Sequence, residues 1–368
     1  MIFSVHILDL SLTTYRNITQ AHLQCHPRFN LVVGDNGQGK TNLLSSIYWL
    51  STLTPLRTQK VRELVQWGKQ QTQVQSYVEL QGLKHQLAVG YQSGKKQAWR
   101  EGKKVNSKSY FGVLSVVSFT PHDLLLVRGS PELRRRFLDR AIFNESTSHL
   151  GTVLRYQKAL ERRNAALRNQ SDDAILSAYE STLSDIAAWL MLSRARYLLH
   201  FAPTFQETLS AICGFEGTVS YKPSLSQAPL GEGKSTLQAY LANYWAQHRD
   251  SDRQRGFTQR GPHSDDFSLL LQEKSAKSYA SQGQQRAIVL ALKIAQIENL
   301  SHRMKARPIL LLDDISSELD QTRSQLLFSF LNNFEGQVFI SSTHEQYIPI
   351  QSDAQIWRVK AGMITGEL

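Results

Sequence analysis

The stretch Gly34-Asp35-Asn36-Gly37-Gln38-Gly39-Lys40-Thr41 fits G-x-x-x-x-G-K-[ST], the pattern of a phosphate-binding P-loop. An apolar segment, Phe29–Val33, precedes it, and Thr41–Thr52 has the length and composition of a helix. Glycines let the backbone turn so that amide groups point at phosphates, and the following helix N-terminus favours the same anion. We expect Lys40 to reach the β- and γ-phosphates of ATP and the Thr41 hydroxyl to bind Mg²⁺.

A second motif, Ser281-Gln282-Gly283-Gln284-Gln285-Arg286, resembles the signature loop of ABC-type ATPases. It opens a predicted helix, Gln285–Leu300, which Ser281 can cap. Backbone amides at this helix start can bind an anion, and Ser281, Gly283 and Gln284 are the candidate residues. In ABC-type ATPases that anion is the γ-phosphate of a nucleotide held by another subunit. The resemblance therefore predicts a homodimer that closes around ATP.

The apolar run Ile309–Leu312 ends in Asp313 and Asp314, which is the Walker B pattern. We expect the Asp313 carboxylate to hold Mg²⁺, mainly through water. Asp314 stands where many ABC ATPases carry Glu, and a carboxylate there can orient or deprotonate the attacking water. Asp is one methylene shorter than Glu, so slow hydrolysis is expected. Lys40 and Asp314 are thus the candidate catalytic residues.

Two further segments resemble ABC elements that sense the γ-phosphate. Ser316-Ser317-Glu318-Leu319-Asp320 resembles the D-loop, which crosses the dimer near that phosphate. Ser342-Thr343-His344 follows a predicted strand, where this enzyme class keeps a switch residue. Thr343 and His344 both remain candidates for that role.

The order of the motifs predicts an α/β protein of two lobes. Residues 1–119 and 303–368 carry the P-loop and Walker B strands, and we assign both to one ABC-type P-loop ATPase lobe with a mixed sheet around the P-loop helix. Residues 120–302 form an inserted, mainly helical lobe with basic helices and the signature loop. The chain is long enough for two hydrophobic cores.

Composition narrows the class of protein. The 368 residues carry 42 Lys and Arg against 31 Asp and Glu, a net charge of +11 that suits a polyanionic partner such as nucleic acid. The two cysteines, Cys25 and Cys213, lack metal-ligand spacing. The first residues lack the basic segment of a signal peptide, and Asp9 interrupts their apolar stretch. No apolar run is long enough to cross a membrane. We therefore expect a cytoplasmic protein without a zinc site.

The positive charge is concentrated in the predicted helical lobe. Residues 126–168 contain ten Lys or Arg and four acidic residues. Arg134, Arg135 and Arg136 point in different directions on a helix, so we expect some of the arginines to make internal ion pairs. Arg155, Lys158 and Arg162 have i, i+3, i+7 spacing, which places them on one face of a helix. We expect this face to bind DNA phosphates without reading sequence.

Taken together, the motifs resemble the RecF family of bacterial recombinational-repair proteins, over nearly the whole chain. Tyr15 stands where the family usually has Phe, and Ser264 where Arg is common, so no role for an arginine is carried over to that position. The segments that carry the resemblance are Leu10–Asn17, Gly34–Thr41, Thr120-Pro121, Gly129–Asp139, Arg163–Leu167, Gly261–Asp266 and Asp313–Asp320.

The resemblance implies an ATP-dependent DNA-binding dimer with slow, DNA-stimulated ATP hydrolysis. Such proteins act at single-strand gaps and junctions between single-stranded and double-stranded DNA. There they help the RecO and RecR families load the RecA recombinase in place of single-strand binding protein.

Two alternatives use the same P-loop. The ATPase subunit of a membrane transporter is more compact, whereas here more than half of the chain separates Gly34 from Ser281. A nucleotide kinase would leave the signature and D-loop segments unexplained. ATP-dependent binding to gapped DNA would separate the RecF-like hypothesis from both.

Overall fold

The computed structural model describes residues 3–56, 60–314 and 320–367. The chain forms two compact units. The P-loop unit comprises Met1–Asp123 and Gln296–Leu368, and the helical unit comprises Leu124–Ala295. The sequence pattern puts the junctions after residues 119 and 302. The helix α10 (Gln282–Met304) contains both the boundary expected after residue 302 and the boundary after Ala295 in the structure.

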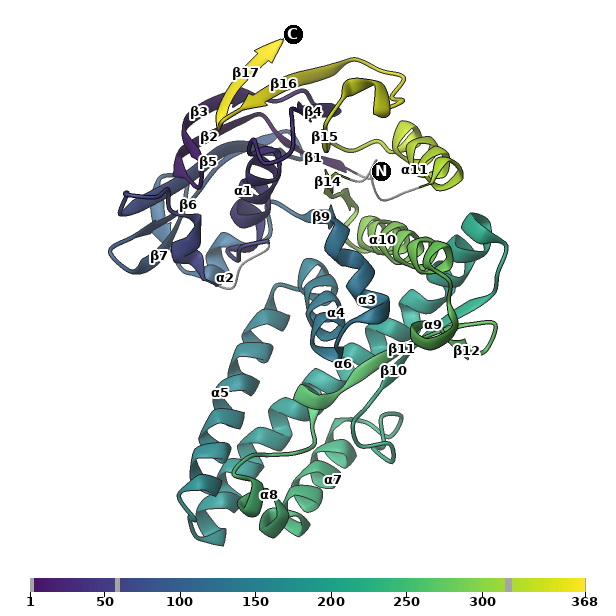
Figure 1. Ribbon diagram of the computed structural model, residues 1–368. Helices are drawn as coiled ribbons and strands as arrows, with labels where there is room; N and C mark the ends of the chain where they lie inside the picture. The colour runs from purple at the N-terminus through teal and green to yellow at the C-terminus, as the bar shows by residue number, and fades with distance from the viewer. Residues whose placement is uncertain (1–2, 57–59, 315–319, 368) are drawn as a thin grey trace. The chain divides into compact units, whose positions relative to one another are not determined.

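A six-stranded sheet of the order β17-β16-β4-β15-β14-β9 carries the P-loop (Figure 1). β15 (Val338–Ser342) lies between β4 (Phe29–Val33) and β14 (Ile309–Asp313), and all three strands are parallel and fully buried. Parallel strands end at the same edge of a sheet, so the P-loop and Asp313 meet at that edge. The remaining strands are β9 (Val116–Phe119), β16 (Ala354–Lys360) and the antiparallel β17 (Met363–Glu367).

A second, mostly antiparallel sheet of eight strands completes the P-loop unit. The path β13-β1-β5-β6-β7-β8 is extended by β2, which pairs with both β3 and β5. The strands are β1 (Phe3–Ile7), β2 (Asp9–Tyr15), β3 (Ile18–Gln24), β5 (Gln71–Leu80), β6 (Leu83–Gln92), β7 (Lys95–Arg100), β8 (Lys103–Val105) and β13 (Ala306–Arg307).

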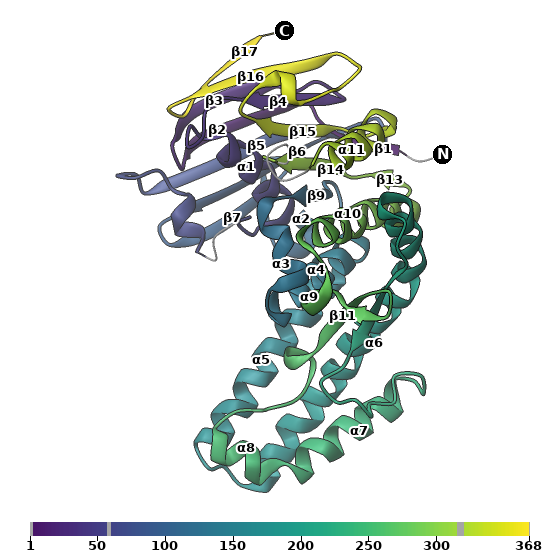
Figure 2. The same cartoon turned by 45° about the vertical axis from the view of Figure 1, so that its right-hand side comes forward.

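The helix α1 (Lys40–Thr52) packs between the two sheets, as Figures 1 and 2 both show. Its apolar side chains, such as Leu43 and Ile47, share one core with Val32 of the six-stranded sheet and Val74 of the eight-stranded sheet. A helix covered on several sides needs apolar residues around most of its circumference. This packing fixes the N-terminus of α1 directly after the P-loop. The unit also contains α2 (Ser107–Tyr110) and α11 (Gln321–Asn333).

The helical unit is built on α5 (Ser148–Arg168) and the 41-residue α6 (Asp173–Cys213), which pack against each other (Figure 2). A small antiparallel sheet packs on α6. Within the described residues, no helix is both long and apolar enough to cross a membrane. The other elements are α3 (Leu125–Arg128), α4 (Pro131–Glu145), β10 (Gly217–Lys222), α7 (Lys234–Gln247), α8 (Arg249–Arg255), β11 (Asp266–Leu271), β12 (Lys274–Ser275) and α9 (Ala276–Tyr279).

Candidate functional site

The P-loop backbone makes turns that only glycine fits. Gly37 and Gly39 have φ angles of 82° and 121°, where other residues are strained. A Cβ atom on Gly39 would lie 2.8 Å from the Asn17 amide nitrogen, and one on Gly34 would lie 2.3 Å from the Val359 carbonyl oxygen. No side chain of the described residues caps α1, and an uncapped helix N-terminus is a common binding site for anions.

Lys40 is almost fully buried at the centre of this loop, with 6 % of its surface exposed. Its Nζ atom donates to the Gly34 and Asp35 carbonyl oxygens, at 2.6 and 2.9 Å. Burial lowers the pKa of Lys40, while the carboxylates of Asp314, Asp313 and Asp35 oppose that shift. Because carbonyl oxygens are neutral acceptors, the positive charge of Lys40 remains available to an anionic phosphate.

Asp313 and Thr41 meet beside the P-loop. The Thr41 hydroxyl donates to Asp313 Oδ1 at 2.7 Å, and the Ser341 hydroxyl donates to the same oxygen at 2.9 Å. Strand register explains the second contact, because Asp313 of β14 pairs with Ser341 of β15. Asp313 is 1 % exposed. Mg²⁺ commonly takes one or two protein oxygens together with phosphate and water oxygens, so Thr41 and Asp313 fit it chemically.

Asp314 directly follows β14 in a left-handed backbone conformation, with φ at 51°. Its backbone N–H donates to the Ser341 hydroxyl at 3.0 Å. Aspartate tolerates this conformation better than most residues, and such angles cluster at functional sites. Ser341 therefore holds both acidic residues in place, a role that the sequence motifs did not indicate.

Asn17 and Arg16 form a clamp on the P-loop that sequence reasoning also missed. The Asn17 amide donates to the Gln38 carbonyl oxygen at 2.8 Å and accepts from Asn42 at 2.7 Å. Arg16 donates to the Asn42 side chain at 3.2 Å. Both residues belong to the segment Leu10–Asn17, which carries part of the family resemblance. That resemblance was the sequence feature that could have indicated their role.

The signature segment starts α10 with reciprocal capping bonds. The Gln284 backbone N–H donates to the Ser281 hydroxyl at 3.2 Å, and the Ser281 backbone N–H donates to the Gln284 side chain at 2.8 Å. This is a capping box, which fixes the first turn of a helix. Ser281 and Gln282 are exposed, and Gly283 and Gln284 are half-buried. The helix start is thus ordered and faces solvent, where another molecule can reach it.

Comparisons with known proteins agree with these features. A family model described as the RecF/RecN/SMC N terminal domain matches residues 6–363. A DNA replication and repair protein RecF of Myxococcus xanthus (strain DK1622) is 41% identical over 345 residues, or 92% of this chain and 91% of that protein. Its counterpart in Anaeromyxobacter sp. (strain Fw109-5) is 41% identical over 366 residues, or 98% of each. The chain belongs to the RecF family.

Solved structures extend the likeness to the fold. The recombination mediator protein RecF-ATP in the RecFOR pathway superposes with a TM-score of 0.92 at 27% identity, covering 100% of this chain and 99% of that one. An SMC head bound to the C-winged helix domain of ScpA superposes with a TM-score of 0.59 at 13% identity, covering 98% and 97%. The predicted fold class, an ABC-type ATPase head with an inserted helical lobe, is confirmed.

In the basic segment 126–168 of this RecF-family chain, some Arg and Lys side chains contact other residues of the helical unit, whereas others are exposed to solvent. Arg134 makes a two-bond ion pair with Asp266, at 2.7 and 2.9 Å. Arg135 donates to the Asp265 carbonyl oxygen, and Arg136 pairs with Glu132. The three adjacent arginines thus serve internal contacts, and the expectation that some would be structural is met.

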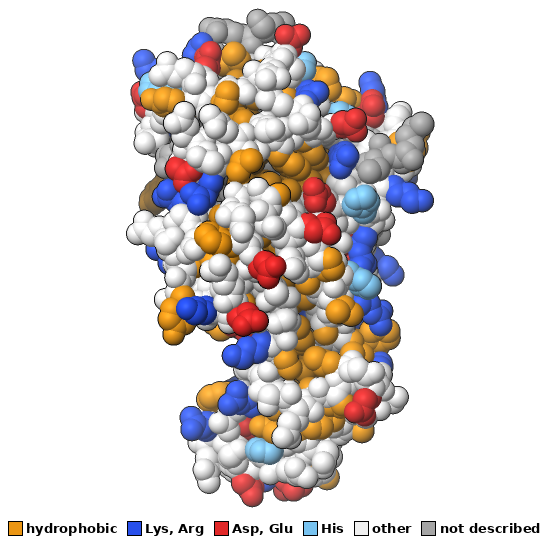
Figure 3. Space-filling model, turned by 90° about the vertical axis from the view of Figure 1, so that its right-hand side faces the viewer, with side chains coloured by type: hydrophobic (Ala, Val, Ile, Leu, Met, Phe, Trp, Pro, Cys, Tyr) orange, Lys and Arg blue, Asp and Glu red, His pale blue; other side chains and the backbone are white. Residues whose placement is uncertain are grey.

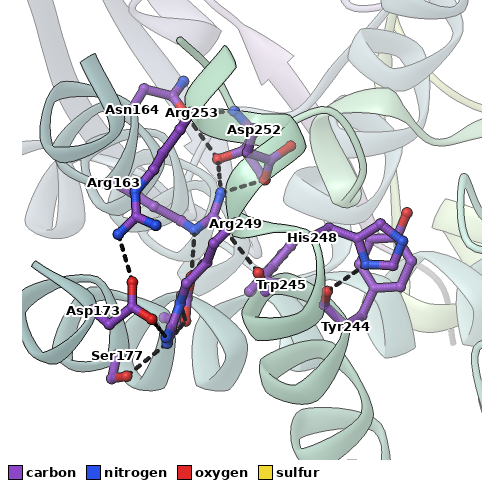
Figure 4. A network of polar contacts seen from close by, with 12 residues as sticks. Arg163, Asn164, Asp173, Ser177, Tyr244, Trp245, His248, Arg249, Asp252 and Arg253 are labelled. Atoms are coloured by element: carbon purple, nitrogen blue, oxygen red, sulfur yellow. Dashed lines mark hydrogen bonds and ion pairs between the residues drawn. The ribbon is translucent and has the colours of Figure 1, made fainter. Parts of the chain in front are cut away.

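Arg163 is fully buried in a network of polar contacts between α5, α6 and α8 (Figure 4). It pairs with Glu180 at 2.9 Å and with Asp252 at 2.7 Å. Arg249 pairs with the other oxygen of Glu180. Since its charge is matched by two carboxylates, Arg163 is unavailable to DNA.

Arg155, Lys158 and Arg162 are all exposed on α5. Arg155 donates only to the Thr152 hydroxyl, at 3.4 Å, and none of the three forms an ion pair with a described residue. Figure 3 shows one face of the molecule, on which Lys, Arg and His side chains gather along the right-hand margin and acidic side chains lie nearer the middle.

The segments expected to sense the γ-phosphate are only partly described. Ser316, Ser317, Glu318 and Leu319 of the D-loop segment lie outside the described residues, whereas Asp320 caps α11 through the Arg323 N–H. Thr343 is half-buried and His344 is exposed directly after β15. The Ser342 hydroxyl donates to the His344 carbonyl oxygen at 3.0 Å. Both Thr343 and His344 remain candidates for the switch.

Proposed function

We propose that this RecF-family protein binds ATP, dimerises around it and binds gapped or junction DNA during replication and recombinational repair. Its relatives of 41% identity are named DNA replication and repair proteins, which supports the process. A RecF structure described with ATP, at a TM-score of 0.92, supports the nucleotide. By family resemblance, RecR and RecO family mediators are its partners, and it assists RecA loading.

The ATP site is assigned to Gly34–Thr41. The P-loop amides and Lys40 hold the phosphates, and burial of Lys40 among neutral oxygens supports this role. Thr41 and Asp313 hold Mg²⁺, which neutralises phosphate charge when it is bound. Their hydroxyl and carboxylate oxygens lie 2.7 Å apart, and Ser341 keeps Asp313 in that position.

Asp314 acts on the water that attacks the γ-phosphorus. Its carboxylate accepts a hydrogen bond from that water and takes its proton, while the bond from phosphorus to the bridging oxygen of ADP breaks. The side chain is short and its backbone is pinned by Ser341, so it has limited reach. Slow hydrolysis is therefore expected, with DNA binding as the stimulus by family resemblance.

Dimerisation is assigned to the start of α10. Ser281, Gly283 and Gln284 contact the γ-phosphate held by the second copy. The capping box supports this assignment, because it orders a solvent-facing helix N-terminus that has a positive partial charge. ADP lacks the γ-phosphate, so only ATP joins the two copies. DNA phosphates are assigned to Arg155, Lys158 and Arg162 on α5.

The main support for the proposal is that Lys40, Thr41 and Asp313 lie together at one edge of the sheet. The same chain has an exposed signature segment that caps the start of α10. Sedimentation of the wild-type chain should show a monomer with ADP and a dimer with ATP. Ser281→Arg should remain monomeric while binding ATP normally. A mass that ATP leaves unchanged, at protein concentrations well above the expected dissociation constant of the dimer, would refute the proposal.

The two acidic residues can be separated by the same approach. Asp314→Asn should slow hydrolysis and keep ATP and Mg²⁺ binding, because it affects only the water. Asp313→Asn should weaken the Mg²⁺-dependent binding of ATP. Equal binding defects in the two variants would contradict this division of roles.

A further inference from the structure

Trp67 is the most exposed large hydrophobic side chain in the described part of the chain, with 97 % of its surface exposed. It lies in the P-loop unit, between a 3₁₀ helix, Val61–Leu64, and β5. A single exposed apolar side chain is common and indicates nothing by itself. The backbone that carries Trp67 and the charges around it distinguish this position.

The turn that presents Trp67 is tied to its neighbours on both strands of the β2–β3 hairpin. The Gln66 backbone N–H donates to the Thr14 carbonyl oxygen at 2.9 Å, and the Gln66 side chain donates to the Thr19 hydroxyl at 3.0 Å. The Lys69 N–H closes the turn on the Gln66 carbonyl oxygen at 3.0 Å. Gly68 supplies the φ angle of 78° that this turn needs. The indole therefore projects from an ordered backbone, which reduces the entropy lost on binding.

Cationic residues flank this turn in the sequence. Arg62 and Lys69 are exposed on either side of Trp67, and Lys60 is exposed at the start of the segment. Strand register adds Lys95, because Gln71 at the start of β5 pairs with Gln92, which pairs with Lys95. Glu63 is the acidic residue of the segment 60–70. An aromatic ring among cations matches single-stranded nucleic acid, whose bases stack on the ring while its phosphates contact the cations.

The same facts disfavour another use of the indole. An apolar protein partner would need apolar surroundings. The neighbouring residues, Gln66, Lys69 and Gln70, are polar or charged.

The turn is also linked to the P-loop through the β2–β3 hairpin. The Arg16 backbone N–H donates to the Leu64 carbonyl oxygen at 2.7 Å, just before the Trp67 turn. The Arg16 side chain contacts Asn42 of α1, and Asn17 contacts the Gln38 carbonyl oxygen in the P-loop. A ligand on Trp67 is thus held by the hairpin that clamps the nucleotide loop.

We propose that Trp67 is a stacking platform for an unpaired base of gapped or single-stranded DNA, with Arg62, Lys69 and Lys95 contacting the adjoining phosphates. The inference rests on the proposed DNA-binding function and adds to it a site in the P-loop unit that recognises unpaired bases. Duplex DNA has no free base face, so Trp67 contributes to gapped and single-stranded DNA only.

Fluorescence anisotropy of the full chain with ATP tests this inference. The probes are a labelled duplex, the same duplex with a single-strand gap, and a single strand. Trp67→Ala should weaken binding of the gapped and single-stranded probes about 5- to 150-fold and leave duplex binding unchanged. Trp67→Phe keeps a ring and should restore most of the affinity. Trp189→Ala removes a half-exposed tryptophan of the helical unit and should change none of the three affinities.

Each contrary outcome has a defined meaning. Equal losses for duplex and gapped DNA, or no loss at all, would overturn the stacking role. Weaker ATP binding by Trp67→Ala with unchanged DNA binding would assign the indole to adenine, and would also overturn it. A wild-type chain that binds no DNA would overturn the proposed function together with this inference, whereas the first two outcomes leave the proposed function standing.

Discussion

The two units of this RecF-family protein bury cations in different ways. In the P-loop unit, Lys40 is buried against neutral carbonyl oxygens and forms no ion pair with a described residue. In the helical unit, Arg134, Arg163 and Arg194 are buried against carboxylates. A charge matched by carboxylates stabilises a fold but has no affinity left for a ligand. A buried charge on neutral acceptors remains available to an anion that comes from outside.

The largest expected effect is on the stability of the helical unit. Arg163→Met would leave Glu180 and Asp252 buried without their shared partner, which costs about 3–5 kcal/mol. Urea unfolding followed by circular dichroism measures this loss. Arg162→Met is the matched control, because the neighbouring side chain is exposed and its removal should cost less than about 0.5 kcal/mol. Similar losses in both variants would show that the buried network is not what holds α5.

The second largest effect concerns Lys40, the buried cation of the P-loop unit. Lys40→Met removes the cation that we assign to phosphate binding, and ATP affinity should fall about 100-fold or more. Unfolding of the variant should stay close to wild type, since Lys40 hydrogen-bonds to carbonyl oxygens and forms no ion pair with a described residue. Lys96→Met is a control, because Lys96 also donates to a carbonyl oxygen, that of Leu53, but outside the P-loop. Calorimetric titration with ATP should give wild-type affinity for Lys96→Met, and wild-type affinity for Lys40→Met would exclude the assigned role.

A pH dependence follows from a third buried pair. Burial alone would raise the pKa of Asp139, but the Arg194 guanidinium and hydrogen bonds from His149 and Arg194 lower it to about 2. A depressed carboxyl pKa stabilises the fold above the unfolded-state value and loses that effect on acidification. The helical unit should therefore lose about 2 kcal/mol between about pH 4 and pH 2. Asp139→Asn should be less stable at neutral pH, and its unfolding should lack this component of the acid dependence.

The smallest effect concerns the exposed cations of α5. Replacing Arg155, Lys158 and Arg162 by glutamine should flatten the salt dependence of DNA affinity, by about 0.9 on logarithmic axes for each phosphate that the variant no longer binds. ATP-driven dimerisation should be unaffected. A matched variant replaces Lys84, Lys103 and Lys104, which are exposed in the P-loop unit, and should keep the wild-type slope. If the two triple variants changed the slope equally, DNA binding would depend on net charge alone and not on α5.

The sequence by itself determined the family and the main elements of the fold. Gly37 and Gly39 permit the positive φ angles of the P-loop, and an apolar run before Asp313 makes a buried strand. These are local properties, set by backbone sterics and by the period of hydrophobic residues. The helix start at Ser281 could also be predicted from the sequence, because a capping box joins two residues that are only three positions apart.

Only the tertiary structure decided which polar residues serve the fold and which remain available. Arg162 and Arg163 are adjacent and chemically identical, yet one is exposed and the other pairs with carboxylates from α6 and α8. Ser341 holds Asp313 and Asp314 because β15 inserts between β4 and β14, an order that no local pattern encodes. Such contacts join residues far apart in the chain, and their partners are selected by packing of the whole unit.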